Sequence, residues 1–150
     1  FEKYLTDKVF TQVKTQAPTG VLVFIDFDNF KLINDSQGHK AGDKALVKLA
    51  NFLSNLSRPG DFVARFGGDE FAMWLNGLDK PKARALFKPL LLNTSFFSEF
   101  SVDRRKPVGI SAGIVLLDRN CDRTASDLIE RADILMYRRK KDKKRRRANK

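Results

Sequence analysis

The chain has 150 residues, of which 42% are hydrophobic, which is enough for the core of one domain rather than two. Its single cysteine excludes an internal disulfide, and the sequence has no apolar run long enough to suggest a membrane span. The formal net charge is +11, but residues 138–150 carry ten Lys or Arg and one Asp, so this segment accounts for +9 and residues 1–137 for +2.

The first half of the chain predicts helices around one buried strand. Over residues 1–14, apolar side chains recur at helical spacing and predict a helix that ends before the turn residues "APTG". The run "VLVFIDF" predicts a buried strand, and "NFKLIND" predicts a short helical turn. From Asp43 onward, leucines on one face predict a longer helix that ends at "SRPGD".

The second half predicts a hairpin, a helix, a strand and a last helix. "FVARF" and "FAMWL" flank a Gly-Gly turn, which is a β-hairpin signal, and Trp74 in the second of these strands is expected in the core. A helix is predicted over 80–92 and a strand in "VGISAGIVLL". Thr124 and Asp127 form a capping box before the final helix. This order indicates an α/β (α+β) domain with an antiparallel-rich sheet.

Two acidic pairs stand next to turns. Asp26 and Asp28 lie two residues apart at the end of the first strand, so their side chains leave it on the same face. Asp69 and Glu70 follow the glycine pair at the hairpin tip. Each pair alone also has a structural interpretation: Asp28 can cap the next helix, Asp26 can mark the end of the buried strand, and the glycines can form a tight turn with solvated acids.

Together, the two pairs would gather three or four carboxylates at one edge of a sheet. Like charges that close repel one another unless a cation neutralises them, and oxygen ligands suit Mg²⁺ or Mn²⁺. Glycines without side chains would let a phosphate approach the turn, and their N–H groups can donate to it. The combination therefore predicts a metal and nucleotide site.

The strings "DFDNFKLINDSQGHKAGDKAL", "RFGGDEF" and "ISAGI", in this order and spacing, resemble the signature of the GGDEF family of diguanylate cyclases. The resemblance extends over nearly the whole chain. It implies a palm-like fold, similar to the palm of polymerases and of adenylyl cyclases, in which helices wrap a central sheet and the GGDEF motif lies on a hairpin. It also implies a Mg²⁺-dependent nucleotidyltransferase that condenses two GTP molecules into cyclic di-GMP and releases pyrophosphate.

The same resemblance implies roles for individual residues. The metal ligands would be Asp26, the Phe27 carbonyl, Asp69 and Glu70, and the last two would form the catalytic acid pair, with Asp69 as the candidate that activates the 3′-hydroxyl. The residues around GTP would be Phe27, Asn29, Phe30, Lys31, Asn34, Asp43, Gly67, Gly68, Lys140 and Lys144. Asn34 and Asp43 match the positions that recognise guanine, although an amide can also end a helical turn and a carboxylate can stabilise a helix N-terminus.

"RPGD" at residues 58–61 matches the RxxD inhibitory site of the family. Arg58 offers a planar fork and Asp61 an acceptor for guanine N–H groups, so the pair can bind cyclic di-GMP as a feedback inhibitor. The structural alternative is a Pro-Gly turn with ordinary charges at its ends. The resemblance also implies that each domain binds one GTP, so that turnover requires a homodimer with two-fold symmetry.

The chain also departs from the family pattern. A stretch similar to "LTGLxNR" is missing before the first helix, and the C-terminal segment only partly follows "ADxALYxAKxxGRN", with Lys144 in the place of an arginine. A noncatalytic receptor for cyclic di-GMP or GTP is therefore an alternative. A third hypothesis is a module that binds nucleic acid or acidic membranes through the basic segment.

The resemblance implies a GGDEF catalytic domain over 1–137, and the charge distribution sets off a basic C-terminal extension over 138–150. A basic run at a terminus is typical of a solvated or disordered segment, and no aromatic stacking platform accompanies it, so we expect no specific nucleic-acid partner. The lone cysteine favours a cytoplasmic location. Because the chain begins at Phe1 rather than Met, we expect a longer parent protein with a sensory or input domain, which can be anchored in a membrane.

Overall fold

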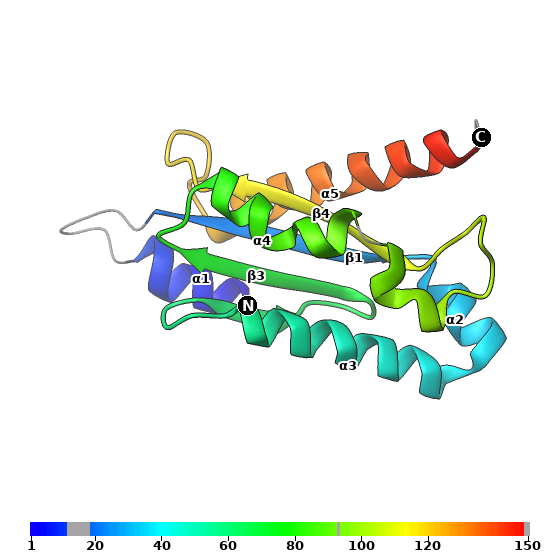
Figure 1. The fold of residues 1–150 in the computed structure, drawn as a ribbon. Helices are drawn as coiled ribbons and strands as arrows, with labels where there is room; N and C mark the ends of the chain where they lie inside the picture. The colour runs from blue at the N-terminus through cyan, green and yellow to red at the C-terminus, as the bar shows by residue number, and fades with distance from the viewer. Residues whose placement is uncertain (12–18, 93, 149–150) are drawn as a thin grey trace.

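A four-stranded antiparallel sheet forms the centre of the computed structural model, which describes residues 1–11, 19–92 and 94–148 (Figure 1). The strands are β1 (Gly20–Asp28), β2 (Phe62–Arg65), β3 (Glu70–Asn76) and β4 (Gly109–Leu116), in the order β2-β3-β1-β4. Every residue of β1 is buried, as expected for a central strand made of consecutive apolar residues. The predicted hairpin of β2 and β3 and the antiparallel sheet are confirmed.

Helices cover both faces of the sheet. They are α1 (Glu2–Leu5), the π-helical turn η1 (Thr6–Phe10), α2 (Phe30–Gln37), α3 (His39–Leu56), α4 (Lys80–Leu92), the 3₁₀ segment η2 (Thr94–Phe100) and α5 (Ala125–Ala148). Side chains of β1 alternate between two apolar clusters: Val23 and Phe27 pack with α2, α3, α4 and η2, whereas Leu22 and Phe24 pack with α1, η1 and α5. Trp74 is 1% exposed in the second cluster, which confirms its predicted place in the core.

The last helix is the main difference from the sequence prediction. Thr124 and Asp127 form the predicted capping box. The Thr124 N–H donates to the Asp127 carboxylate at 2.8 Å, and the Asp127 N–H donates to the Thr124 hydroxyl oxygen at 3.2 Å. From there α5 runs unbroken for 24 residues, so residues 138–148 continue the helix, and most of them are exposed to solvent. Its C-terminal end lies at the same end of the molecule as α2 (Figure 1). None of the helices described is both long and apolar enough to cross a membrane.

Candidate active site

Three of the predicted acids gather where β1 and β3 meet the hairpin turn. Asp26 on β1 is the register partner of Glu70 on β3 and of Ser111 on β4. The Phe27 N–H donates to the Asp69 carbonyl at 3.4 Å, so β1 contacts the turn beyond the paired residues. The structure therefore brings Asp26, Asp69 and Glu70 to one end of the sheet.

A lysine from α5 contacts the first of these acids. The Lys140 ammonium donates to the Asp26 carboxylate and, at 2.9 Å, to the Phe27 carbonyl. Burial raises the pKa of Asp26 to about 6; the hydrogen bond and the charge of Lys140 oppose this rise, and the negative charges of Asp69 and Glu70 add to it. The surrounding protein thus balances the charge of Asp26 only in part.

Two oxygen atoms of this cluster suit a cation. Among the described residues, no three Asp, Glu, His or Cys side chains lie close enough together to hold a metal ion as they stand. The Asp26 carboxylate and the Phe27 carbonyl nevertheless share one cation, the Lys140 ammonium. Both are hard oxygen ligands of the kind that Mg²⁺ and Mn²⁺ prefer, so a divalent ion fits them once Lys140 withdraws.

The glycine pair shapes the turn that carries the other two acids. A Cβ on Gly67 would lie 2.5 Å from Oε2 of Glu70, so this glycine leaves room for a carboxylate whose pKa is raised by burial and by Asp69. A Cβ on Gly68 would meet nothing within 4 Å. Within the described part of the chain, the Gly68 N–H has no hydrogen-bond partner. Open space and a free donor therefore leave the turn accessible to a ligand at Gly68.

Arg65 holds the same turn from the end of β2, although the sequence analysis did not select it. Its Nε donates to the carbonyl oxygens of Gly67 and Gly68 at 3.2 and 3.0 Å. The signal was available in "RFGGDEF", because the carbonyl groups of a glycine turn need donors and a guanidinium two residues earlier can supply several.

Asp28 does not join the acidic cluster. It is 4% exposed, and its carboxylate accepts hydrogen bonds from Ser111 Oγ at 2.7 Å and from Lys143 Nζ at 3.0 Å. The interpretation of Asp28 as a helix cap is wrong, because Ser111 and Lys143 already use both of its oxygen atoms and the residue before α2 is Asn29. The only signal for Lys143 was its helical spacing from Lys140, which places both lysines on one face of α5.

Apart from Phe27 on β1 and the glycine pair of the hairpin turn, the predicted GTP residues of the first half lie on α2, just before it, or on α3. Asn29 adopts the left-handed conformation, with φ of 65°, which turns the chain sharply from β1 into α2, and its side chain donates to the Pro107 carbonyl at 3.0 Å. Asn34 faces α3 so closely that a Cβ on Gly42 would lie 2.1 Å from its Oδ1. Asp43, the next residue, is exposed, as are Lys31 on α2 and Lys144 on α5.

The RxxD residues form a turn that hydrogen bonds hold against the C-terminal end of β3. Asp61 has a side chain only 1% exposed, and it accepts from the backbone N–H groups of Arg58 and Asn76 at 3.0 and 2.8 Å. Arg58 reaches the same carboxylate at 3.5 Å, but its side chain is 52% exposed. Because Glu70 and Asn76 stand at opposite ends of β3, this turn lies roughly 20 Å from the acidic cluster at ~3.4 Å per residue.

The family model described as "Diguanylate cyclase, GGDEF domain" matches residues 1–146. This chain belongs to that family. The match confirms the resemblance drawn from the sequence, and solved structures similar to this GGDEF domain confirm the fold class.

Three relatives illustrate the similarity. The chain is 38% identical over 137 residues to the "Probable diguanylate cyclase DgcE" of Escherichia coli K12, which covers 91% of this chain and 12% of that protein. The GGDEF domain of TpbB (YfiN) from Pseudomonas aeruginosa is 30% identical, with a TM-score of 0.77 over 95% of this chain and 82% of that one. A microbial GGDEF domain solved for its interaction with cyclic di-GMP is 31% identical, with a TM-score of 0.70 over 94% of this chain and 84% of that one. The chain thus spans a small part of its full-length relative.

Proposed function

We propose that this domain is a diguanylate cyclase, which condenses two GTP molecules into cyclic di-GMP and releases pyrophosphate. The observation that carries the proposal is the meeting of Asp26, Asp69 and Glu70 at one end of the sheet, beside a lysine from α5. Membership of the GGDEF family, with its full motif present at residues 67–71, supports the same conclusion.

The proposed reaction forms two phosphodiester bonds. The 3′-oxygen of one GTP attacks the α-phosphorus of the other, the bond from that phosphorus to pyrophosphate breaks, and Asp69 accepts the hydroxyl proton; the reciprocal attack then closes the ring. A divalent ion held by Asp26, the Phe27 carbonyl and Asp69, with Glu70 completing the cluster, would neutralise the triphosphate and lower the pKa of the attacking hydroxyl. Because the chemistry needs few protein groups, the domain mainly positions the reactants.

The remaining residues would hold GTP. Asn34 and Asp43 lie where α2 and α3 approach each other, and their amide and carboxylate groups complement the N1 and N2 edge of guanine. The triphosphate would be contacted by Lys31 and by the backbone around Asn29 and Phe30, where α2 begins. The free N–H of Gly68 would donate to it as well. Lys140 and Lys144 would add positive charge from α5, and Lys140 would leave Asp26 to do so.

Turnover would require two domains that face each other, since each holds one GTP. The deciding experiment mixes the concentrated, purified domain with GTP and Mg²⁺ and identifies the products by mass spectrometry, in parallel with Asp69→Asn. We expect cyclic di-GMP from the unmodified domain and none from the variant. If neither forms product, a version fused to a dimerising segment is tested next. A forced dimer that binds GTP without forming cyclic di-GMP would contradict the cyclase.

A noncatalytic receptor for GTP or cyclic di-GMP is the second candidate. The observation that favours it is the contact of Lys140 with two of the proposed metal ligands, which opposes metal binding in the ligand-free domain. In this case the forced dimer would bind nucleotide and make no product. Feedback inhibition through Arg58 and Asp61 is part of the cyclase proposal, and it requires cyclic di-GMP to compete with the backbone groups that Asp61 already binds.

A further inference from the structure

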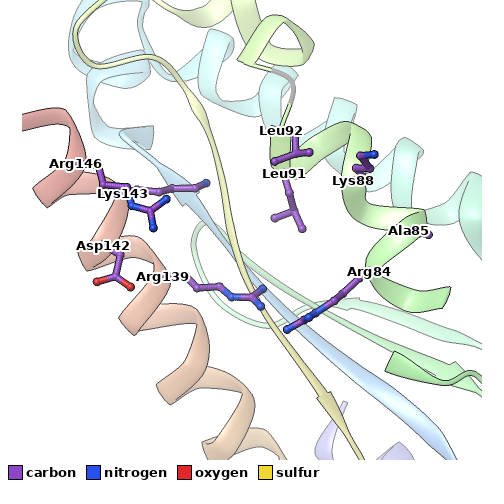
Figure 2. A pocket seen from close by; sticks show the side chains of 9 residues that line it. All are labelled: Arg84, Ala85, Lys88, Leu91, Leu92, Arg139, Asp142, Lys143 and Arg146. Carbon is purple, nitrogen blue, oxygen red and sulfur yellow. The ribbon is translucent and has the colours of Figure 1, made fainter. Parts of the chain in front are cut away.

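A groove of about 590 Å³ lies between α4 and α5 (Figure 2). Strand β4, at the edge of the sheet, passes between the two helices, and side chains from α5 reach its free edge. Arg139 donates to the Ala112 carbonyl at 2.7 Å, and Lys143 donates to the Ile110 carbonyl. The groove thus has two helical walls and a strand edge that is already capped by cations.

Positive charge in this groove far exceeds negative charge. Among the described residues, five cationic residues line it, and Asp142 is the only acid that does. The cationic residues are Arg84 and Lys88 from α4, and Arg139, Lys143 and Arg146 from α5. Within the described residues, Arg84, Lys88 and Arg146 make no hydrogen bond or ion pair. Three cations are therefore available to a ligand.

Two guanidinium groups converge across the groove without a carboxylate between them. Figure 2 shows Arg84 and Arg139 pointing toward one another from the two helices. Burial lowers the pKa of Arg139, and the positive charge of Arg84 lowers it further. The pKa of Lys80, in the first turn of α4, is lowered by burial and then by Arg84, Arg139 and Arg131. An anion between the helices would relieve this repulsion.

The groove also offers apolar surface beside its charges. Leu91 and Leu92 line it from the last turn of α4, and Leu92 is 71% exposed. A volume of about 590 Å³ lies within the range of roughly 300–1,000 Å³ that is typical of small-molecule sites. A concave site of this size suits a compact ligand better than a flat lipid surface, and guanidinium groups match phosphate oxygens in a bidentate geometry.

We propose that the groove between α4 and α5 binds a phosphate-bearing small molecule, with phosphate groups between Arg84 and Arg139 and near Lys88, and an apolar or aromatic part on Leu91 and Leu92. This site is separate from the acidic cluster, because Lys140 turns to Asp26 while Arg139 turns to the β4 edge and the groove. The proposal does not depend on cyclase activity.

The first test titrates inorganic triphosphate into the domain without divalent metal, and follows backbone amide signals by nuclear magnetic resonance. We expect the largest shifts over residues 84–92 and 139–146. The double variant Arg84→Gln/Lys88→Gln should raise the dissociation constant about tenfold. The control Lys3→Gln/Lys8→Gln removes the same charge from exposed positions on α1 and η1, and it should change binding less than about twofold.

Equal weakening in both double variants would indicate general attraction to a basic chain and would overturn the proposal. So would shifts confined to the acidic cluster, or tighter binding to anionic vesicles or an acidic peptide than to triphosphate. A second titration uses ATP and Leu92→Gln. This variant should weaken ATP binding and leave triphosphate binding unchanged, because only the nucleoside reaches Leu92; unchanged ATP binding would refute the apolar part of the site.

Discussion

Lys140 decides how charge is distributed at the candidate active site. Its ammonium group contacts the Asp26 carboxylate and the Phe27 carbonyl, two of the ligands that the proposed reaction assigns to a divalent ion. The same side chain is proposed to bind the triphosphate, so metal and nucleotide should enter together: the phosphates attract the lysine, and its departure frees the oxygen ligands. The ligand-free domain should bind metal weakly as a result.

Lys140→Met should therefore strengthen metal binding in the absence of nucleotide. We expect the Mn²⁺ affinity to rise about tenfold, since one competing cation is removed from a partly buried pair of ligands. Titration of Mn²⁺ by electron paramagnetic resonance measures this directly, at a pH of about 8 that keeps Asp26 charged. Lys141→Met is the control, because Lys141 lies over the Tyr137 ring and is exposed. Equal or weaker Mn²⁺ binding by Lys140→Met would contradict this role.

Asp26 should make stability fall as pH rises. Its pKa is raised from 3.8 to about 6 in the folded domain, so between these values the folded state binds more protons than the unfolded state. The free energy of unfolding therefore decreases as pH rises through about 4 to 6. Asp26→Asn should reduce this slope, not abolish it, because the pKa of Glu70 is raised as well. Thermal unfolding over this pH range measures the effect, and identical slopes in both proteins would refute it.

At the scale of elements, local patterns were sufficient where a segment is buried along its whole length or along one clear face. β1 is a continuous apolar run that is buried throughout, and the leucines of α3 recur at helical spacing on its buried face. The predicted strand and helix are both confirmed. The 3₁₀ segment η2 was missed because "TSFFSEF" is too short to show a period; its Phe97 and Phe100 enter the core through contacts with distant elements. The continuation of α5 was missed because charge obscured its spacing.

The candidate site was predictable only where a motif names its residues. The Gly-Gly turn and its acids could be located from "RFGGDEF", and Asp26 from its strand. The partner of Asp28 could not be located from the sequence, because Lys143 lies 115 residues away. Only the packing of α5 on β4 brings the two side chains together. Nor does "RPGD" reveal that Asp61 also ties its turn to β3, since that depends on the N–H of Asn76.

The hairpin turn offers a matched pair of substitutions. Gly67→Ala would place a methyl group against the Glu70 carboxylate and should lower the free energy of unfolding by ~1 kcal/mol. Gly68→Ala meets open space, so it should leave stability within ~0.5 kcal/mol of the unmodified domain. It should still weaken GTP binding about tenfold if the nucleotide lies against the turn, as measured by calorimetry with Ca²⁺. A Gly68→Ala variant that binds GTP normally would place the nucleotide elsewhere.

At the scale of the whole molecule, the proposed catalytic and inhibitory sites stand at opposite ends of one strand. β3 carries Glu70 at one end and Asn76 at the other, and Asn76 is held by Asp61. A ligand on Arg58 therefore cannot touch the acidic cluster of the same domain. Inhibition by cyclic di-GMP would act by keeping two domains apart or misaligned, which the two-fold geometry of the reaction makes effective.

Arg58→Ala should abolish inhibition by cyclic di-GMP without changing the unfolding temperature, because its side chain is half exposed and makes only long contacts of 3.4 and 3.5 Å. Asp61→Ala should instead lower the free energy of unfolding by ~2 kcal/mol, since the backbone N–H groups of Arg58 and Asn76 would lose an acceptor that is itself buried. Initial rates with added cyclic di-GMP, together with thermal unfolding, separate the two effects. Persistent inhibition of a stable Arg58→Ala domain would exclude the RxxD turn as the inhibitory site.

The lysines of α5 also affect when the sheet can fold during translation. Asp26 and Asp28 leave the ribosome with β1, but the ammonium groups that accompany them in the folded domain follow 114 and 115 residues later. Until then the central strand carries two acids that cannot be buried without cost. The sheet should consequently close late in translation, and a chain ending at Tyr137 should fail to form it. Deleting residues 138–150 would therefore remove the cations that pair with Asp26 and Asp28 as well as a basic surface.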